Sequence, residues 1–330
     1  MTTVAVTLGD AAGIGPEIVV KAFADPAINP VCSAFVVGHA ATLERAAQRF
    51  APGLQVRRIT HAAQHRTAAG VVDVLDVGEL PDDLPMGQVS ALAGQAAFEA
   101  IDCAIGMALR GEVAAICTAP IHKEALAAAG VPYPGHTEML AERTGSTDTA
   151  MMLVNPQLRT ILVTVHCAMR QALELLTVER ELRIILLAHR SLQAMGMAQP
   201  RIAVAGLNPH AGEGGLFGSE DLQIIAPAIA QARAMGVDAS GPHPGDTVFM
   251  QARRGRYDIV VAQYHDQGLI PIKLLGVEDG VNVTAGLPFV RTSPDHGTAF
   301  DIAGQGIADA SSLKTALRAA VQLSQGAAAR

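Results

Sequence analysis

The sequence predicts an α/β fold of the doubly wound kind. Short apolar runs of strand length alternate with helix-compatible segments along almost the whole chain, which is typical of parallel sheets covered by helices. Half of the 330 residues are hydrophobic, so a core of substantial size can form, and the length suits two lobes or one large one. Only 3% of the residues are aromatic and none is Trp, so the helices are expected to pack through Ala, Val and Leu.

The expected elements follow in chain order. A first strand is predicted over residues 4–8, and a helix starts near Pro16, because proline suits the first helical turn. A strand at 34–37 then precedes a helix over 40–50. Further strands are expected at 113–117, 161–165, 202–205 and 259–261. The segments 90–110 and 179–197 are predicted to be helices, because they are rich in Ala and carry their apolar residues on one face.

Neither an internal repeat nor a long polar linker interrupts this alternation. If the chain forms two lobes, it must therefore pass between them through short ordered connections. Two segments rich in turn-forming residues are candidates for these passages, namely 131–135 and 280–286.

The charge and cysteine content exclude several classes of partner. With 31 acidic and 24 basic residues and no Lys/Arg-rich block, neither nucleic acid nor a membrane is an expected partner, although a local basic pocket could hold a small anion. The chain begins directly with a strand and has no long uninterrupted apolar segment, so we expect a soluble, cytoplasmic protein. The four cysteines show no C-x-x-C spacing, which argues against a zinc ribbon or a disulfide scaffold.

Three histidines each stand just past an apolar, β-branched run. His166 follows ILVTV, His210 follows RIAVAGLNP, and His265 follows DIVVAQY. Ligands of open α/β sheets bind beyond the carboxyl ends of the strands, so these imidazoles could converge on one divalent metal. Three protein ligands leave a coordination position open, as in catalytic metal sites. The alternative is that each histidine is an ordinary surface or hydrogen-bonded core residue.

Two carboxylates accompany these histidines. Asp246 lies in HPGDT, and Asp266 directly follows His265. Either could orient a ligand histidine or act as a base toward a substrate hydroxyl whose pKa the metal has lowered. The alternatives are a helix N-cap for Asp246 and a solvated loop acid for Asp266.

Two glycine-containing segments are candidates for a cofactor site. GDAAGIGPE, residues 9–17, lies between a strand and a helix but lacks the third glycine of a Rossmann fingerprint, because Ile18 stands there. The backbone N–H groups at its helix start would favour binding of an anion. Equally, the glycines could serve only a tight turn between the strand and the helix. The segment SPDHGTAFDIAGQGIAD, residues 293–309, reads as a loop feeding a helix start and could hold an adenosine and its phosphate.

A further group of polar residues could surround a phosphate. These residues are His136 and Thr137 in GHTE, Lys273 in IPIKLL, Asn282 in GVNVT and Arg291 in FVRTS. The last three lie within apolar, strand-like runs, where an isolated cation is costly unless it is paired. Arginine would supply a bidentate fork and lysine a point charge, whereas Thr137 could simply cap a helix.

The motifs together resemble the PdxA family. GDxxGIGPE from residue 9, PGHTE at 134–138, NPHAGEGG at 208–215, YHDQG at 264–268 and DHGTAFDIAG at 295–304 occur in the family's order. That family is in turn similar to isocitrate and isopropylmalate dehydrogenases. The resemblance implies a two-lobed α/β/α fold with the active-site cleft between the lobes and a non-classical NAD site. It implies an NAD-binding lobe of residues 1–130 and 285–330, and a metal, substrate and dimerisation lobe of residues 131–284.

The resemblance also implies a role for each candidate residue. The metal, most often Zn²⁺ but with Co²⁺, Ni²⁺, Mn²⁺ or Mg²⁺ as alternatives, is held by His166, His210 and His265 in a homodimer with its site at the interface. The phosphorylated substrate is held by His136, Thr137, Lys273, Asn282 and Arg291. NAD or NADP is expected at Gly13, Gly15, Glu17, His296, Gly297, Thr298 and Asp301. Proton transfer is expected from Asp246, Asp266 and Lys273.

The implied reaction is the oxidation and decarboxylation of 4-phosphohydroxy-L-threonine to 3-amino-2-oxopropyl phosphate, in pyridoxal phosphate biosynthesis. Two departures from the family pattern leave alternatives open. Ala11 replaces the usual proline, and the segment 167–170 is CAMR, which resembles relatives that dehydrogenate cis-dihydrodiols such as that of terephthalate. Those relatives tend to lose the phosphate residues, which this chain keeps. A branch acting on 4-phosphoerythronate or phosphothreonate fits the phosphate residues equally well.

Two functions outside this family are the alternatives, a metal-dependent hydrolase and a non-catalytic protein that binds small anions. A hydrolase would have no use for the HGTA-type segment and the GIGPE turn. A binding protein would have no use for an open metal position. The sequence therefore favours the dehydrogenase.

Overall fold

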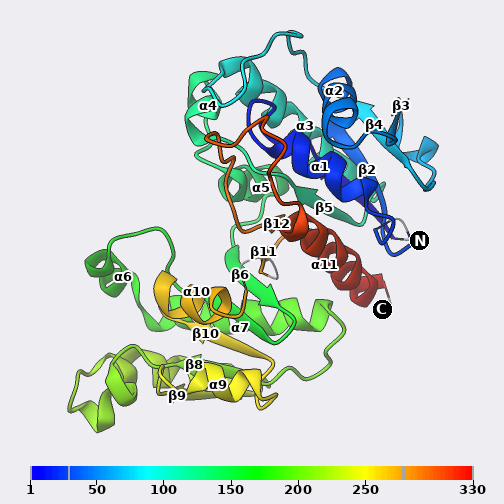
Figure 1. The fold of residues 1–330 in the computed structure, drawn as a ribbon. Helices are drawn as coiled ribbons and strands as arrows, with labels where there is room; N and C mark the ends of the chain where they lie inside the picture. The colour runs from blue at the N-terminus through cyan, green and yellow to red at the C-terminus, as the bar shows by residue number, and fades with distance from the viewer. Residues whose placement is uncertain (1, 29, 277–279, 329–330) are drawn as a thin grey trace. The chain divides into compact units, whose positions relative to one another are not determined.

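The computed structural model describes residues 2–28, 30–276 and 280–328, and the chain divides into two compact units (Figure 1). Unit 1 comprises Met1–Thr147 and Leu287–Gln325. Unit 2 comprises Asp148–Gly286 and Gly326–Arg330. Strands and helices alternate in both units, so the predicted α/β class is confirmed.

Unit 1 is built on a parallel sheet. In spatial order its described strands are β3 (Gln55–Ile59), β4 (Val71–Asp76), β2 (Ser33–Gly38), β1 (Thr3–Thr7), β5 (Ala115–Thr118) and β12 (Val290–Pro294). β2 and β5 are buried at every position, as expected where helices cover both faces of a parallel sheet. The helical segments are α1 (Gly15–Ala24), α2 (Ala40–Phe50), η1 (Ala62–Gln64), α3 (Ala91–Leu109), α4 (Lys123–Ala128), α5 (His136–Thr144) and α11 (Ser311–Ala328).

Unit 2 has a mixed sheet. Its described strands are, in spatial order, β11 (Val281–Ala285), β6 (Ala150–Asn155), β7 (Leu158–Leu162), β10 (Ile259–Ala262), β8 (Ile202–Ala205) and β9 (Ala239–His243). β6 runs antiparallel to β11 and β7, whereas β7, β10, β8 and β9 are parallel. The helical segments are α6 (Met169–Leu175), α7 (Val178–Ala194), η2 (Pro209–Gly215), η3 (Asp221–Ile225), α8 (Ala226–Ala234), α9 (Val248–Arg253) and α10 (His265–Lys273).

Most predicted elements appear where the sequence placed them. The helix over 40–50 and the strand over 202–205 match α2 and β8 to the residue. The strand expected at 161–165 begins earlier, because β7 starts at Leu158 as the second arm of a hairpin with β6. Its pairing with β10 continues past Leu162, since the N–H of Thr164 still donates to the Gln263 carbonyl at 3.2 Å.

The strand-like interpretation of IPIKLL is wrong, because this segment forms the end of α10. Leu269 and Ile272 are buried while Ile270 and Lys273 are exposed, which is the spacing of a helix with one buried face. Lys273 is therefore an exposed cation at a helix C-terminus, where the helix dipole favours positive charge.

The segment 131–147 belongs to unit 1, whereas the family resemblance implies a place for it in the second lobe. Tyr133 stacks on Phe98 of α3 with ring centres 6.2 Å apart, and Met139 and Leu140 join the same core cluster. The Pro-rich turn is thus a packed part of unit 1. The units meet in the chain at Thr147–Asp148 and at Gly286–Leu287, the latter beside the expected passage at 280–286.

Among the described helices, α3 alone is long and apolar enough to span a membrane by length and composition. Half of its 18-residue window is buried within the protein. Gly94 packs so closely on α4 that a Cβ there would overlap the carbonyl of Ala125. These contacts identify α3 as a core helix of unit 1, because buried core helices meet the same length and composition criteria.

Candidate active site

The three histidines predicted as metal ligands follow three neighbouring strands of unit 2. β10 pairs in parallel with β7 on one side and with β8 on the other, so the carboxyl ends of all three lie at one edge of the sheet. His166 follows β7, His210 follows β8, and His265 is the first residue of α10 directly after β10. This edge is where an α/β sheet presents ligand-binding loops.

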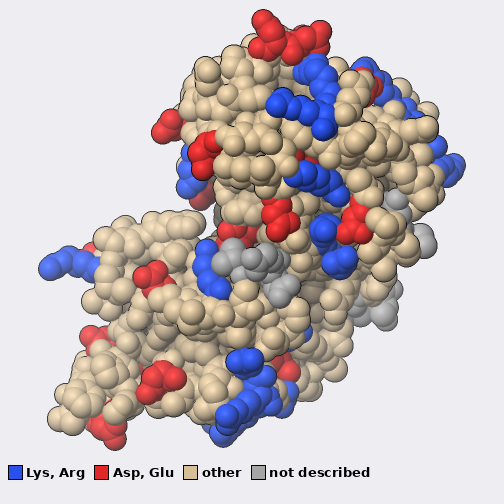
Figure 2. Space-filling model, in the orientation of Figure 1, with Lys and Arg blue, Asp and Glu red and all other residues tan. Residues whose placement is uncertain are grey.

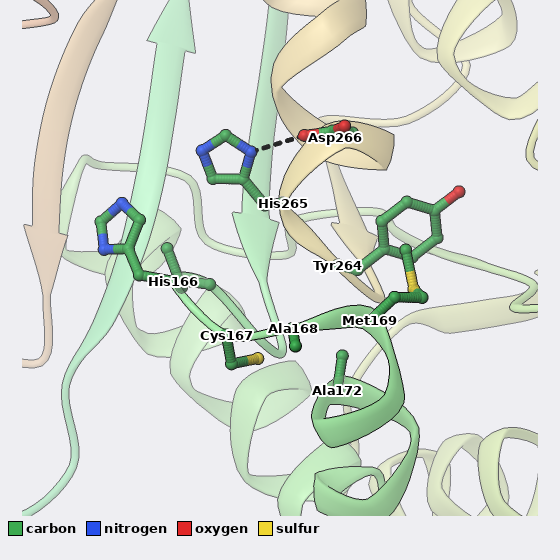
Figure 3. A pocket seen from close by; sticks show the side chains of 9 residues that line it. His166, Cys167, Ala168, Met169, Ala172, Tyr264, His265 and Asp266 are labelled. Carbon is green, nitrogen blue, oxygen red and sulfur yellow. Dashed lines mark hydrogen bonds and ion pairs between the residues drawn. The ribbon is translucent and has the colours of Figure 1, made fainter.

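An open pocket of about 550 Å³ lies beyond β7 and β10 (Figure 3). His166 and His265 stand on the same side of it, with ring centres 5.7 Å apart. Nδ1 of His265 hydrogen-bonds the Asp266 carboxylate at 2.7 Å, which leaves Nε2 for a ligand. A carboxylate that fixes the tautomer and orientation of an imidazole is the usual companion of a metal-binding histidine. The remaining lining residues are Val165, Cys167, Ala168, Met169, Ala172 and Tyr264.

His210 does not join the other two histidines within the chain. It stands on η2, a left-handed turn in which φ is 52° at His210, 54° at Ala211 and 43° at Glu213. Its side chain is 62% exposed, and its Nδ1 lies 3.3 Å from the Glu213 carboxylate. Across the described ranges, no three His, Cys, Asp or Glu side chains are grouped to hold a metal ion. One chain therefore brings together two of the three predicted ligands.

The buried carboxylate of Asp221 anchors the start of this left-handed turn. It accepts hydrogen bonds from the N–H of Leu207 at 2.8 Å, and from the N–H and Nδ2 of Asn208 at 3.1 and 2.8 Å. Non-glycine residues in the left-handed region cost energy and persist where the surroundings determine the backbone. The Asp221 bonds fix the backbone where the turn begins, so the exposed His210 stands on an anchored loop.

Only one of the three predicted proton-transfer residues lies at the pocket. Asp266 is among its lining residues, whereas Asp246 is exposed before α9 and Lys273 is exposed at the far end of α10. The hydrogen bond to His265 engages Asp266 as an orienting group.

Three of the predicted phosphate residues lie in unit 1. His136 and Thr137 are the first two residues of α5, and Arg291 is buried in β12, where it donates to Thr118 Oγ1 at 2.6 Å. Burial lowers the pKa of Arg291 to about 10. Burial, and then the charge of Arg291, lower the pKa of His136 well below its usual value. A buried guanidinium beside a helix start is suited to an anion. The two other predicted residues, Lys273 and Asn282, belong to unit 2.

The two candidate cofactor segments meet in unit 1. The N–H of Ile14 donates to the Thr298 carbonyl at 3.0 Å, and a Cβ on Gly13 would lie 2.9 Å from Thr298. A Cβ on Gly15 would overlap the Leu8 carbonyl, so this glycine serves the turn between β1 and α1. His296, Gly297 and Asp301 lie in the loop after β12, where Gly297 and Asp301 are exposed.

Glu17 has a structural role in this arrangement. Its buried carboxylate pairs with Lys21 at 2.7 Å and accepts the N–H groups of Gly306 at 3.2 Å and Ala308 at 2.8 Å. Both carboxylate oxygens are therefore engaged by the protein. Glu17 ties the end of the 293–309 segment to α1, and contact of this side chain with a cofactor remains a prediction.

The sequence interpretation missed three polar residues near these segments. Asp10 is fully buried, its Oδ1 accepts the N–H of Ala12 at 2.8 Å, and burial raises its pKa. His122 stacks on Phe300 with ring centres 4.4 Å apart, and Thr118 binds Arg291. Asp10, Thr118 and His122 stand at or just beyond the carboxyl ends of β1 and β5, the same criterion that singled out the three histidines.

A second set that the sequence interpretation missed lies beneath the histidine loops. Glu181 of α7 is fully buried and accepts a hydrogen bond from Gln263 Nε2 at 3.1 Å. Burial raises the pKa of Glu181 to about 7, the Gln263 bond opposes this, and the nearby Asp221 adds to it. Helical spacing could have revealed Glu181, because Ile184 and Ile185 on the same face of α7 are buried.

The raised pKa of Glu181 gives stability a defined pH dependence. Between pH 4.5, the ordinary glutamate value, and about 7 the folded protein binds a proton that the unfolded chain has lost, so its free energy of unfolding falls as the pH rises. Across this pH range the loss in the free energy of unfolding due to Glu181 is on the order of 3 kcal/mol. We expect urea unfolding followed by circular dichroism at pH 5 and pH 8 to show this loss, and Glu181→Gln to remove it. An equal pH dependence in both proteins would contradict the assignment.

Charged side chains of both signs lie on the surface of the protein (Figure 2). On the face shown in Figure 2, Lys and Arg are interspersed with Asp and Glu. The net charge is −7. An extended basic surface of the kind that binds a phosphate backbone is not seen on that face.

Comparisons with known proteins agree with this geometry. Residues 30–320 match the model of a family described as pyridoxal phosphate biosynthetic protein PdxA. The chain is 56% identical to a 4-hydroxythreonine-4-phosphate dehydrogenase of Beijerinckia indica, over 97% of this chain and 94% of that protein. It is 51% identical to a D-threonate 4-phosphate dehydrogenase of Salmonella typhimurium, over 97% and 98%. A crystal structure of 4-hydroxythreonine-4-phosphate dehydrogenase from Klebsiella pneumoniae superposes with a TM-score of 0.93 at 51% identity, covering 98% of both chains.

Proposed function

Because the chain belongs to the PdxA family, we propose that it oxidises and decarboxylates 4-phosphohydroxy-L-threonine to 3-amino-2-oxopropyl phosphate, a step of pyridoxal phosphate biosynthesis. It is a dehydrogenase that acts on a CH–OH group, a class that uses a nicotinamide cofactor. We propose NAD, with NADP as the alternative, at the meeting point of residues 13–15 and 296–301. The observation that carries the phosphate assignment is the buried Arg291 guanidinium beside the start of α5.

The side chains of unit 1 suit a phosphorylated ligand. With its pKa lowered, His136 is neutral at pH 7 and would donate a hydrogen bond to a phosphate oxygen without a charge of its own. Arg291 would supply charge and a planar fork, held in place by the Thr118 hydroxyl. Thr137, Lys273 and Asn282 are proposed as further phosphate or substrate contacts.

A divalent metal is proposed at the histidines of unit 2, with Zn²⁺ as the leading candidate. His166 and His265 would hold it in one copy, and His210 of a second copy would complete the set in a homodimer. Three observations support this composite site: His210 stands apart from the other two in its own chain, its side chain is exposed, and the adjoining Leu216 and Phe217 expose apolar surface. When bound, such a metal lowers the pKa of a substrate hydroxyl and stabilises developing negative charge.

Of the three residues predicted for proton transfer, Asp266 has a contact that indicates its role. Asp266 fixes the tautomer of His265 through Nδ1, so it is proposed to orient that ligand. Asp246 and Lys273 are proposed as the groups that accept the hydroxyl proton and later return a proton to the product. We propose that the enzyme acts in the cytoplasm, and its four cysteines are free thiols, as a reducing compartment would keep them.

D-Threonate 4-phosphate is a second candidate substrate, because the Salmonella typhimurium relative carries that name at 51% identity. It has the same terminal phosphate and C3 hydroxyl and differs in bearing a hydroxyl in place of the C2 amino group. An aromatic cis-dihydrodiol is the weaker alternative, since it has no phosphate for Arg291 and His136.

A substrate screen tests this proposal directly. We expect NADH absorbance to grow when the protein, NAD and Zn²⁺ are mixed with 4-phosphohydroxy-L-threonine, and D-threonate 4-phosphate in a parallel reaction ranks the two candidates. The dephosphorylated analogues of both acids serve as matched controls and should show little turnover. Turnover of a terephthalate dihydrodiol with none on either phosphorylated acid would overturn the phosphate assignment.

A further inference from the structure

We infer that Gln263 and Glu181 are positioning residues that tie together the three strand ends from which His166, His210 and His265 emerge. The role toward a metal rests on the proposed function. The tie between the strand ends is a property of the chain alone and can be tested without metal.

Gln263 contacts the ends of all three strands. Its carbonyl accepts the N–H of Thr164 at 3.2 Å and the Thr164 hydroxyl at 2.8 Å, two residues before His166. Its side-chain Nε2 donates to the carbonyl of Ala205, the last residue of β8, at 2.9 Å. Gln263 itself lies just after β10 and two residues before His265.

Two neighbours complete the network. Gln267, in the first turns of α10, accepts the N–H of Gln263 at 2.7 Å and donates to the Gly206 carbonyl at 2.8 Å. Glu181 Oε1 accepts the second Nε2 proton of Gln263 at 3.1 Å and so holds its amide in the orientation that reaches Ala205. The network thus crosses from β7 to β10 to β8.

The network begins where the sheet stops. The ladder between β10 and β8 ends at Val261 and Val204, and the partner of β10 in β7 ends at Leu162. Beyond these residues the parallel strands would diverge into separate loops. The Gln263 bonds continue the connection for the few residues that separate the sheet from the histidines.

Stability alone does not account for these groups. A buried polar network stabilises a fold only when every polar group in it has a hydrogen-bond partner. Apolar side chains packed in its place often give the same stability. Two oxygens of the network itself, Glu181 Oε2 and Gln263 Oε1, are buried without a hydrogen-bond partner among the described residues. Because these two buried oxygens without partners lower stability, we expect the network to be retained for another role, namely to fix the positions of the loops that it joins.

Hydrogen exchange of the metal-free protein tests the tie. We compare Gln263→Leu and Glu181→Leu with Glu181→Gln, which keeps an oxygen acceptor for Gln263. The matched control is Leu192→Ala, a fully buried residue near the other end of α7 that destabilises the fold without touching the network. In both leucine variants we expect faster exchange in segments 163–168, 206–212 and 263–268 together, and no such change in Glu181→Gln or the control.

Titration with Co²⁺ alone tests the consequence for the histidines. We expect the dissociation constant to rise at least about tenfold in Gln263→Leu, the scale found when groups that orient metal ligands are removed. Glu181→Gln and Leu192→Ala should bind Co²⁺ as the unmodified protein does. Equal Co²⁺ affinity in Gln263→Leu, or faster exchange confined to 263–268, would overturn the inference. Failure of the unmodified protein to bind Co²⁺ would instead overturn the proposed metal, and the exchange data would still decide the tie.

Discussion

A mixture of the His210→Ala and His265→Ala variants is expected to regain activity that neither variant has alone. Each variant lacks one of the three proposed ligands, and loss of the several kcal/mol that a metal contributes should lower kcat/KM by on the order of a thousandfold. If each site takes His166 and His265 from one chain and His210 from the other, a mixed dimer contains one complete site. Its two mutations then fall together in the second site.

Random exchange of subunits makes half of the dimers mixed, so roughly a quarter of the unmodified activity should return. The measurement is NADH formation after co-refolding or co-expression, with elemental analysis of the metal. A His166→Ala and His265→Ala mixture is the matched control and should stay inactive, because those two residues lie on the same side of one pocket. Full metal content in His210→Ala, or no recovery in the first mixture, would contradict a site shared between chains.

Replacing Arg291 by methionine is expected to abolish recognition of the phosphate while leaving the fold intact. Removal of one member of a buried, charge-assisted contact costs several kcal/mol, so kcat/KM for the phosphorylated substrate should fall by on the order of a thousandfold. Methionine fills much of the volume of the arginine stem. Burial disfavours the charge of Arg291, as the direction of its pKa shift indicates, so we expect its replacement by an apolar side chain of similar volume to leave the protein folded.

Thermal unfolding with and without inorganic phosphate gives a readout independent of turnover. Phosphate should raise the Tm of the unmodified protein and leave that of Arg291→Met unchanged. Arg291→Lys keeps the charge without the planar fork and should retain part of the phosphate effect. A Tm response to phosphate in Arg291→Met equal to that of the unmodified protein would remove Arg291 from the phosphate site.

The alternation of strands and helices could be predicted from the sequence because its signal is local. Ala-rich segments and β-branched runs fix α2, α3, β8 and β10 almost without reference to the rest of the chain. IPIKLL misled because six residues of mixed polarity fit a short strand and a helix end equally well. Ile270 and Ile272 would share one face of a strand, and the exposure of Ile270 beside the buried Ile272 identifies the helix. The packing of Tyr133 on Phe98 joins residues 35 positions apart, which no local pattern encodes.

Those residues of the candidate site that follow the ends of strands could be predicted from the sequence. Those whose role depends on neighbours distant in the sequence could not. The positions of His166, His210 and His265 follow from strand order, and the structure confirms that their strands are neighbours. The separation of His210 from the other two depends on a left-handed turn, which the letters NPHAGEGG do not specify. Glu181 shares the apolar face of α7, so its helical spacing carries a signal, whereas the burial of Gln263 depends on neighbours that are distant in the sequence.

The left-handed turn at η2 also limits how this part of the chain can vary during evolution. His210, Ala211 and Glu213 occupy a backbone region that only glycine enters freely, and Asp221 anchors the residues just before them. Replacing Ala211 or Glu213 by a β-branched residue would be penalised even though both side chains are free of the core, whereas glycine would be accepted. The residues accepted in this loop are therefore limited to those that tolerate a left-handed backbone, glycine above all. A surface segment thus becomes as restricted in its substitutions as a buried one usually is.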